Sequence, residues 1–218
     1  MKKLLLSLAI LSSSAFASDC SSLYPNSEPL QPKNTIELCS SFFVSMYDTN
    51  NRAVIAVSEH LLKGSDVGKE ERVNAFHANP ALKNSPLPGE YLNTGYDKGH
   101  MAPAGDSASV EQMRETFLMT NMTPQLPTVN RDSWKLLEEN VRKQFAKINA
   151  DIWVLNIAIY QPNPSRIGKG IPVPSGYWKI VYLPTETQFY YCDNKPNAKV
   201  VTMSNVDVNK LLQNGGNF

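Results

Sequence analysis

Apolar runs bounded by turn-forming residues predict the strands of this chain. Residues 42–48 are mostly apolar and predict one strand, and the run at 53–58 predicts its return partner. The segment 48–51 between them, Asp-Thr-Asn-Asn, has the composition of a hairpin turn. The nearly continuous apolar run at 152–160, interrupted by Asn156, predicts a strand buried on both faces. Two further strands are expected near 187–192 and 198–203.

Apolar residues at helical spacing predict three helices. A short helix is expected at 109–117 and a short terminal helix at 206–212. A longer amphipathic helix begins at an N-cap, Asp132 or Ser133, and ends near Asn149. Its apolar stripe consists of Trp134, Leu137, Val141, Phe145 and Ile148.

The N-terminus has the pattern of a secretory signal peptide. A basic start at Lys2 and Lys3 precedes the apolar run 4–11, and Ala-Phe-Ala at 15–17 is a small-x-small cleavage site. We therefore expect residues 1–17 to be removed on export, to the periplasm or outside the cell. No other stretch is long and apolar enough for a membrane span. Residues 18–218 are expected to form a single domain, with 18–40 as an N-terminal arm that is irregular over 18–37.

The charge balance restricts how the exported chain could bind nucleic acid. Removing Lys2 and Lys3 leaves 19 basic residues against 20 acidic ones, a formal charge of −1 with the histidines neutral. The protein is therefore not basic overall. Positive charge for binding phosphates must be concentrated in a cleft.

Three cysteines are present in a chain that we expect to be exported. Cys20 and Cys39 flank the proline-rich opening segment, where an oxidising compartment permits a disulfide. We predict that they pair and attach the arm to the first strand. Cys192 lies in an apolar run and is expected to be a buried free thiol.

Candidate chemistry is concentrated in the octapeptide 96–103. It contains Asp97, Lys98, Gly99 and His100 in succession. Histidine is the side chain whose unperturbed pKa suits proton transfer near neutral pH, and lysine supplies fixed positive charge. Glycine lets the backbone approach a bulky group closely. Further along the chain come Glu115-Thr116-Phe117, Thr120 to Gln125, and then Asn130, Trp134 and Glu138.

This ordered set of motifs closely resembles the DNA/RNA non-specific endonucleases, which are ββα-metal nucleases with an Asp-Arg-Gly-His signature. The resemblance runs from about Phe43 to the C-terminus, and Lys98 stands where the family usually has arginine. It implies an α+β fold with a central antiparallel β-sheet flanked by helices. The metal would lie between the motif strand and the 132–149 helix.

The resemblance also implies roles for four residues. His100 would be the general base, kept neutral by its surroundings, and Asn121 would orient the site beside it. Asn130 would bind Mg²⁺, or alternatively Mn²⁺, directly through its amide oxygen. If Asn130 starts the helix, Asn130, Trp134 and Glu138 form one i, i+4 row, with Glu138 roughly 12 Å along the axis. Glu138 would therefore hold a metal-bound water.

Three cations are candidates for substrate binding. Arg72 lies in the long polar connection 63–95, and connections of this length are often functional. Arg72 and Arg131 would contact phosphate, although an exposed surface position is an equally open interpretation of either residue. Lys98 would neutralise a phosphate without the bidentate fork of arginine. Asp97 is expected to fix the local loop by hydrogen bonds rather than bind metal.

The function implied is a secreted, Mg²⁺-dependent, sugar-non-specific endonuclease that cleaves DNA and RNA and leaves 5′-phosphates. The lysine at position 98 motivates an alternative, a catalytically weak nucleic-acid-binding or uptake protein on the same scaffold. A third possibility is a structural envelope protein that neither binds nor cleaves. The absence of a Cys-x-x-Cys pair argues against a zinc site. The sequence carries no signal for an oligomeric state.

Overall fold

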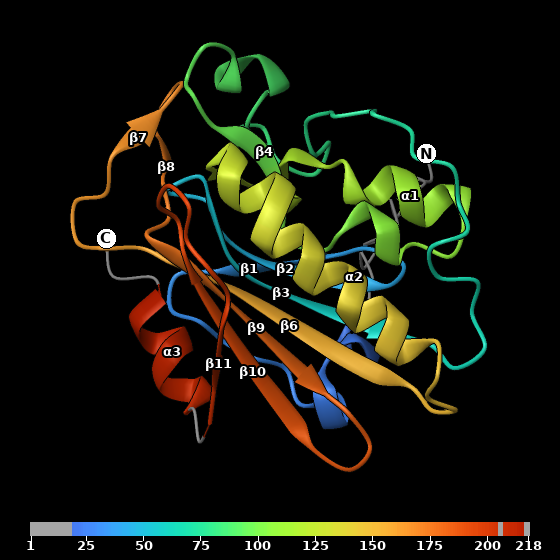
Figure 1. The fold of residues 1–218 in the computed structure, drawn as a ribbon. Helices are drawn as coiled ribbons and strands as arrows, with labels where there is room; N and C mark the ends of the chain where they lie inside the picture. The colour runs from blue at the N-terminus through green and yellow to red at the C-terminus, as the bar shows by residue number, and fades with distance from the viewer. Residues whose placement is uncertain (1–18, 205–206, 216–218) are drawn as a thin grey trace, which may run out of the picture.

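The architecture is a large antiparallel sheet with helices packed on both faces (Figure 1). It is seen in a computed structural model, which describes residues 19–204 and 207–215. The sheet has seven strands in the order β1-β2-β3-β6-β9-β10-β11, and every neighbouring pair is antiparallel. The strands are β1 (Ile36–Cys39), β2 (Phe43–Asp48), β3 (Ala53–Leu61), β6 (Ile152–Ile159), β9 (Gly176–Tyr182), β10 (Thr187–Asp193) and β11 (Val201–Met203).

The strand predictions are confirmed with changes at their ends. The predicted hairpin 42–58 is β2 and β3, and the Asp48 carboxylate closes its turn by accepting hydrogen bonds from the backbone N–H groups of Asn50 and Asn51 at 2.9 and 3.0 Å. The last strand begins at Val201 rather than at residue 198. Strand β1 begins at Ile36, so the prediction that the arm is irregular over 18–37 is wrong for its last two residues.

Two apolar cores lie on opposite faces of the sheet. Successive side chains of a strand point to opposite faces, and Val154 belongs to one core while Leu155 belongs to the other. Helix α2 (Trp134–Phe145) covers the first face, with four stripe residues buried, and helix α3 (Val208–Gly215) covers the second through Leu212. The expected α+β class with flanking helices is confirmed.

The helix boundaries differ from the predictions at α2. Helix α1 (Val110–Thr116) begins after Ser109, whose hydroxyl accepts a hydrogen bond from the backbone N–H of Gln112 at 3.2 Å. Before α2, residues Val129–Ser133 form a π-helical turn, and the Ser133 hydroxyl donates to the Ala198 carbonyl at 3.0 Å instead of capping the helix. Ser133 therefore precedes α2 at the predicted N-cap position, but its side chain makes no capping bond, and α2 ends at Phe145 rather than near Asn149. The predicted start of the terminal helix, Val206, lies outside the described residues.

The disulfide prediction is confirmed. Cys20 and Cys39 are bonded, with their Cα atoms 6.0 Å apart, and this bond ties the N-terminal segment to the end of β1. Cys192 is a buried free thiol, as expected. The predicted signal peptide lies outside the described residues. No helix in the described ranges is long and apolar enough to cross a membrane.

A separate two-stranded ribbon carries the octapeptide motif. Strand β4 (Asp97–His100) pairs antiparallel with β5 (Met122–Gln125), with His100 opposite Met122 and Lys98 opposite Pro124. Pro124 and Gln125, which begin the proline-containing segment 124–127, are residues of β5. Proline is tolerated here because a ribbon consists of edge strands. The ribbon, followed along the chain by α2, forms a ββα unit above the sheet (Figure 1).

The remaining elements of the described residues are β7 (Arg166–Ile167), β8 (Ile171–Pro172) and five short 3₁₀ turns, η1 (Ser21–Leu23), η2 (Pro25–Ser27), η3 (Pro88–Tyr91), η4 (Ala104–Asp106) and η5 (Met119–Asn121).

Candidate active site

The ββα unit forms one side of a cleft of about 550 Å³. Its lining includes a strand residue, His100 of β4, and a helix residue, Glu138 of α2. The structure thus brings together residues that are far apart in the sequence. Six of the seven predicted catalytic, metal-binding and substrate-binding residues line this cleft: Arg72, Lys98, His100, Asn130, Arg131 and Glu138. The seventh, Asn121, does not line it.

His100 is held in an aromatic enclosure. Its ring centroid is 4.9 Å from that of Phe117, edge to face, and 5.8 Å from that of Phe76. The Nε2 atom is buried and has no hydrogen-bond partner among the described residues. Burial lowers the pKa of His100 to about 3, and the positive charge of Arg72 acts in the same direction. The imidazole is therefore neutral at physiological pH, as a general base must be.

Asp97 orients both Asn130 and Arg131. Its carboxylate accepts a hydrogen bond from the Asn130 amide nitrogen at 2.9 Å and two from Arg131 at 2.7 and 2.5 Å. Burial alone would raise the pKa of Asp97, but the hydrogen bonds from Arg131 and Asn130 outweigh it and lower the pKa. Because an ionised carboxylate only accepts, the NH₂ group of Asn130 must face Asp97. The amide oxygen of Asn130 then points away from Asp97, available to a cation.

Glu138 is half-buried in the cleft. Burial raises the pKa of its carboxyl to about 7, although the charge of Lys179 opposes this shift. No cluster of three or more His, Cys, Asp or Glu residues that could hold a metal occurs in the described part of the chain. One amide oxygen and one carboxylate do not suit tetrahedral zinc. They do suit a hard cation that keeps most of its water molecules, as Mg²⁺ does.

The π-helical turn changes which residues share the cleft face of the helix. Asn130 and Glu138 both line the cleft, but Trp134, predicted in the same row, is only 3% exposed and packs in the core. The backbone N–H of Trp134 bonds to the Val129 carbonyl, five residues earlier, so this turn contains an extra residue. The predicted i, i+4 row is therefore wrong at Trp134, whereas Asn130 and Glu138 line the cleft together.

Asn121 supports the backbone that follows His100. Its side chain is fully buried and exchanges two hydrogen bonds with the backbone of Ala102, at 2.8 and 2.9 Å. It also donates to the Thr116 carbonyl at 2.8 Å. These bonds join the end of β4 to the end of α1. On this geometry Asn121 positions the site and does not face the substrate space.

Two cations lie over the aromatic rings that surround His100. The Lys98 ammonium is 4.8 Å from the Phe76 ring centroid, and the Arg72 guanidinium is 5.2 Å from that of Phe117. The Arg72 Nε also donates to the Asn74 side chain at 3.0 Å. Cation–π contacts of this kind restrict otherwise flexible side chains. Positive charge is thus concentrated at the cleft. A chain without a net positive charge needs such a concentration in order to bind phosphates.

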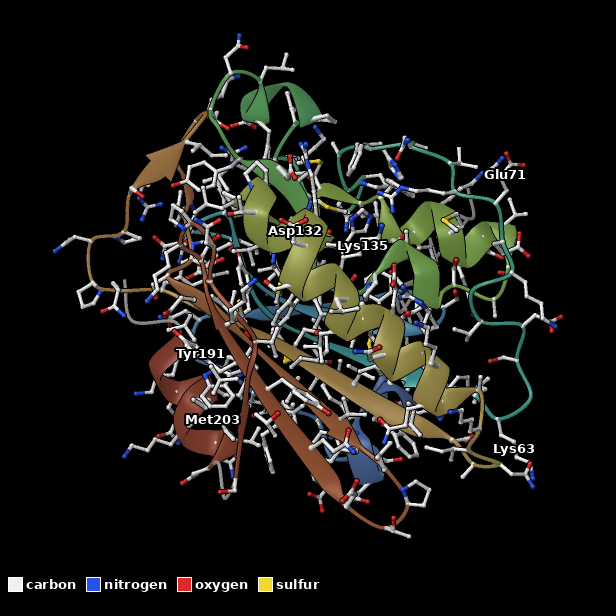
Figure 2. All side chains as sticks on the ribbon, in the orientation of Figure 1. Lys63, Glu71, Asp132, Lys135, Tyr191 and Met203 are labelled. Atoms are coloured by element: carbon white, nitrogen blue, oxygen red, sulfur yellow. A yellow bond between two sulfur atoms is a disulfide. The ribbon has the colours of Figure 1, made fainter. Side chains whose placement is uncertain are left out.

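Arg142 is a cleft residue that the sequence reasoning missed. It lies on α2, four residues after Glu138, and lines the same cleft. Its guanidinium pairs with the buried Asp106 at 2.7 Å, and a Cβ added at Gly105 would come within 2.8 Å of it. Its i+4 spacing from Glu138 was the available signal. Lys135 also lines the cleft, and Figure 2 shows it beside Asp132 at the start of α2.

Comparisons with known proteins agree with this geometry. The family profile described as DNA/RNA non-specific endonuclease matches residues 21–215. A mitochondrial nuclease EXOG from Danio rerio is 35% identical over 153 residues, which cover 63% of this chain and 44% of that protein. Nuclease C1 from Cunninghamella echinulata is 30% identical over 161 residues, which cover 65% of this chain and 63% of that protein. The chain thus spans about half the length of these relatives.

A solved structure gives the same result for the fold. One chain of the crystal structure of the EndoG/EndoGI complex superposes with a TM-score of 0.66 at 26% identity, and the match covers 76% of each chain. The family profile extends over nearly all of the described residues, including the β4–β5 ribbon and α2. The chain therefore belongs to the DNA/RNA non-specific endonuclease family.

Proposed function

We propose that this protein is an exported endonuclease that hydrolyses phosphodiester bonds in both DNA and RNA and requires Mg²⁺ or Mn²⁺. The observation that carries the proposal is the pairing of two groups in one cleft. One is the neutral, enclosed imidazole of His100, and the other is the Asn130 amide, whose oxygen is turned away from Asp97. Three cations, Arg72, Lys98 and Arg131, line the same space.

His100 is proposed to act as the general base. It takes a proton from a water molecule, whose oxygen forms a bond to phosphorus while the bond from phosphorus to the 3′ oxygen breaks. The products are a 5′-phosphate and a 3′-hydroxyl, whose proton comes from solvent. The protein alone holds the pKa of this ring at about 3. A bound phosphate brings negative charge near the ring, which raises the pKa of the imidazole toward the range suited to proton transfer.

The donor set fits a hard divalent cation. Asn130 would be the direct protein ligand, and Glu138 would hold one of the water molecules that remain around the ion. When bound, such a cation would neutralise charge on the phosphate and on the leaving oxygen. Positive charge near Glu138 would also favour its ionised form, which counteracts the effect of burial on its pKa.

Non-specificity follows if the contacts are made to phosphates. Lys98 offers a point charge, and Arg72 is an exposed side chain beside the catalytic ring. Arg131 is already held by Asp97, so it is oriented before substrate arrives. Contacts to phosphate fix position without reading base edges. Such a site accepts DNA and RNA alike.

Export is supported by the leader-like pattern of residues 1–17 and by the Cys20–Cys39 disulfide. Disulfides persist mainly in oxidising compartments. A nuclease without sequence preference is also compatible with a cell only if it is kept away from the genome. The periplasm and the extracellular medium both satisfy this condition.

The test is degradation of supercoiled plasmid DNA and of RNA, with Mg²⁺ and with EDTA. We expect digestion by the wild type, loss of digestion in EDTA, and a decrease of about 10²–10⁴-fold in His100→Ala, the range typical of a removed general base. Asn130→Ala should raise the Mg²⁺ concentration needed for cleavage. His77→Ala is the matched control, because this exposed histidine lies outside the cleft.

Nucleic-acid binding measured in the same samples separates the alternatives. DNA bound by the wild type without digestion, at any Mg²⁺ or Mn²⁺ concentration, would support the binding or uptake protein instead. Neither binding nor digestion would support the structural envelope protein. Digestion retained by His100→Ala would contradict the assigned base and leave the family membership unaffected.

A further inference from the structure

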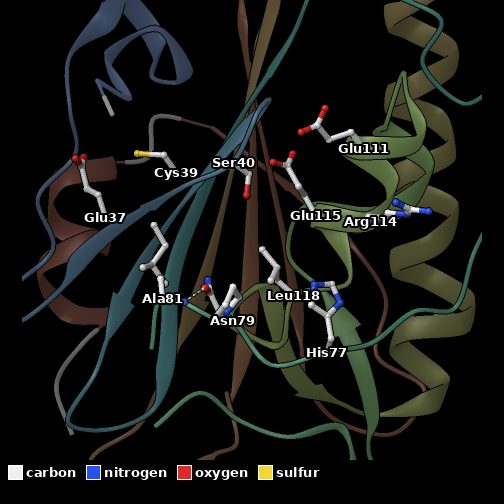
Figure 3. Close-up of a pocket in the computed structure, with 12 residues that line it drawn as sticks. Glu37, Cys39, Ser40, His77, Asn79, Ala81, Glu111, Arg114, Glu115 and Leu118 are labelled. Atoms are coloured by element: carbon white, nitrogen blue, oxygen red, sulfur yellow. Dashed lines mark hydrogen bonds between the residues drawn. The ribbon is translucent and has the colours of Figure 1, made fainter. Parts of the chain in front are cut away.

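A second hollow lies on the other side of the His100 enclosure. It is a groove of about 600 Å³ between β1, α1 and the loop 77–81 (Figure 3). Phe76 and Phe117 face the His100 ring, whereas the next residues, His77 and Leu118, form a parallel β-bridge and line the groove. The groove shares no lining residue with the cleft, so a molecule could occupy it without entering the catalytic space.

The floor and walls of the groove are apolar at several positions. Leu38, Pro80, Ala81 and Leu118 contribute to the lining, and Ala81 is exposed. A volume of about 600 Å³ lies within the range of about 300–1,000 Å³ of typical ligand pockets. An apolar lining with a few polar groups is also the usual composition of such sites. The groove can therefore bury apolar side chains of a ligand.

Carboxylates dominate the charge of the groove. Glu37, Glu111 and Glu115 line it, against one guanidinium, that of Arg114. The Glu111 side chain is exposed and stands in the first turn of α1. One oxygen of Glu115 accepts hydrogen bonds from the backbone and the hydroxyl of Ser41. Figure 3 shows the Glu111 and Glu115 carboxylates on the α1 side, with the Arg114 guanidinium pointing away from β1. The ligand chemistry that complements this wall is cationic.

The opposite wall is the outermost strand of the sheet. Among the described strands, β1 ends the sheet order and pairs with β2 alone. The backbone N–H of Ser40 bonds to the Phe43 carbonyl at 2.8 Å. Because hydrogen-bonded and non-hydrogen-bonded pairs alternate in an antiparallel ladder, Leu38 also faces β2 and Glu37 turns its N–H and C=O outward. A sheet edge of this kind can pair with an added extended segment.

We propose that this groove binds an extended peptide segment of a partner protein, in which aliphatic side chains alternate with lysine or arginine. Its backbone pairs with β1 at Glu37. Its aliphatic side chains contact Leu38 and Leu118, and its basic side chains face Glu111 and Glu115. The inference concerns a site outside the cleft and does not depend on the proposed nuclease function.

The test uses fluorescein-labelled hexapeptides and the full exported chain, with binding measured by fluorescence anisotropy. Valine occupies alternate positions, and lysine, arginine, serine or glutamate occupies the others. We expect the lysine and arginine peptides to bind and the serine and glutamate peptides to bind at least about tenfold more weakly, because charge-assisted hydrogen bonds are lost. Hydrogen exchange at the Glu37 amide should slow when the lysine peptide binds.

Variants locate the binding to the groove. Glu111→Lys and Ala81→Arg alter exposed side chains, so both should fold as the wild type does, which circular dichroism can verify. Each should weaken binding of the lysine peptide about tenfold or more. Glu186→Lys is the control, since it makes the same charge change at an exposed turn between β9 and β10.

Several results would overturn the proposal. Equal affinity for all four peptides, or no binding by any of them, would exclude a site for basic extended segments. Equal weakening in Glu186→Lys would show attraction by overall charge. Equally tight competition by spermidine would show that an aliphatic polyamine suffices. Self-association that Ala81→Arg abolishes would assign the groove to a second copy of this chain.

Discussion

Lowering the pH should decrease the unfolding free energy of this protein because His100 is buried in the folded state. In the folded state the pKa of the imidazole is about 3, while in the unfolded chain it should be near its ordinary value of about 6.5. Between these values the unfolded state binds more protons, so lowering the pH favours unfolding. The stabilisation by neutral His100 is complete above about pH 6.5 and is lost as the pH falls toward 3.

The size of the effect follows from the pKa difference. Between pH 6.5 and pH 5 the unfolded imidazole is protonated and the folded one is not, so each pH unit costs about 1.4 kcal/mol. Those one and a half units amount to about 2 kcal/mol, an upper value because the ring is only half-buried. His100→Gln, a neutral replacement, should lack this loss.

Urea unfolding of both proteins at pH 8 and pH 5, in EDTA and with the disulfide intact, measures the effect. We expect the decrease in unfolding free energy to be up to about 2 kcal/mol smaller in His100→Gln than in the wild type. Other titrating groups, such as Glu138, contribute to both proteins and largely cancel in the difference. Identical pH dependence in the wild type and His100→Gln would refute the argument that burial holds this ring neutral.

Three further predictions test how the site is held together. Asp97→Ala removes the carboxylate that orients Asn130 and should raise the Mg²⁺ concentration for half-maximal cleavage about 10–100-fold. Asp132→Ala, which removes an exposed carboxylate nearby, is the control. An unchanged Mg²⁺ requirement in Asp97→Ala would contradict the role assigned to Asp97. Gly99→Ala places a Cβ 2.3 Å from the Gln125 Oε1 and 2.5 Å from its Cβ, and should lower the unfolding free energy by about 1–3 kcal/mol in urea titrations; Gly89→Ala, with open space around it, should not. Lys98→Ala should reduce plasmid cleavage by about tenfold or more, because one charge-assisted contact to phosphate is lost. Lys98→Arg, which restores the bidentate fork, should cleave at least as fast as the wild type. Slower cleavage by Lys98→Arg would show that the cleft requires the shape of lysine at this position.

Predictions from local pattern were accurate where one face of an element is buried. The spacing of Trp134, Leu137, Val141 and Phe145 placed the core side of α2 correctly, since all four are buried. The runs that became β2, β3 and β6 were found because both faces of these strands are buried, which makes their sequences nearly continuous apolar runs. The octapeptide with Asn130 and Glu138 identified four of the six predicted residues that line the cleft, Lys98, His100, Asn130 and Glu138, because the spacing of the motifs matches that of a known family.

Predictions failed where a partner distant in the sequence decides the structure. Pro124 and Gln125 have the local character of a loop, but pairing with Lys98 and Asp97 makes them part of β5. The spacing of the apolar residues does not predict the π-helical turn at Val129–Ser133. Asn130 belongs to this turn and lines the same cleft as Glu138.

By itself the sequence determined most of the segments that are strands or helices, the candidate residues for the chemistry and the family that the motifs resemble. These properties are local, since they depend on side-chain type and on periods of two or about 3.6 residues. Only the tertiary structure decided that aromatic rings enclose His100, that Asp97 orients Asn130, and that an acidic groove lies behind the cleft. Burial and proximity depend on which distant segments pack together, and no single segment contains that information.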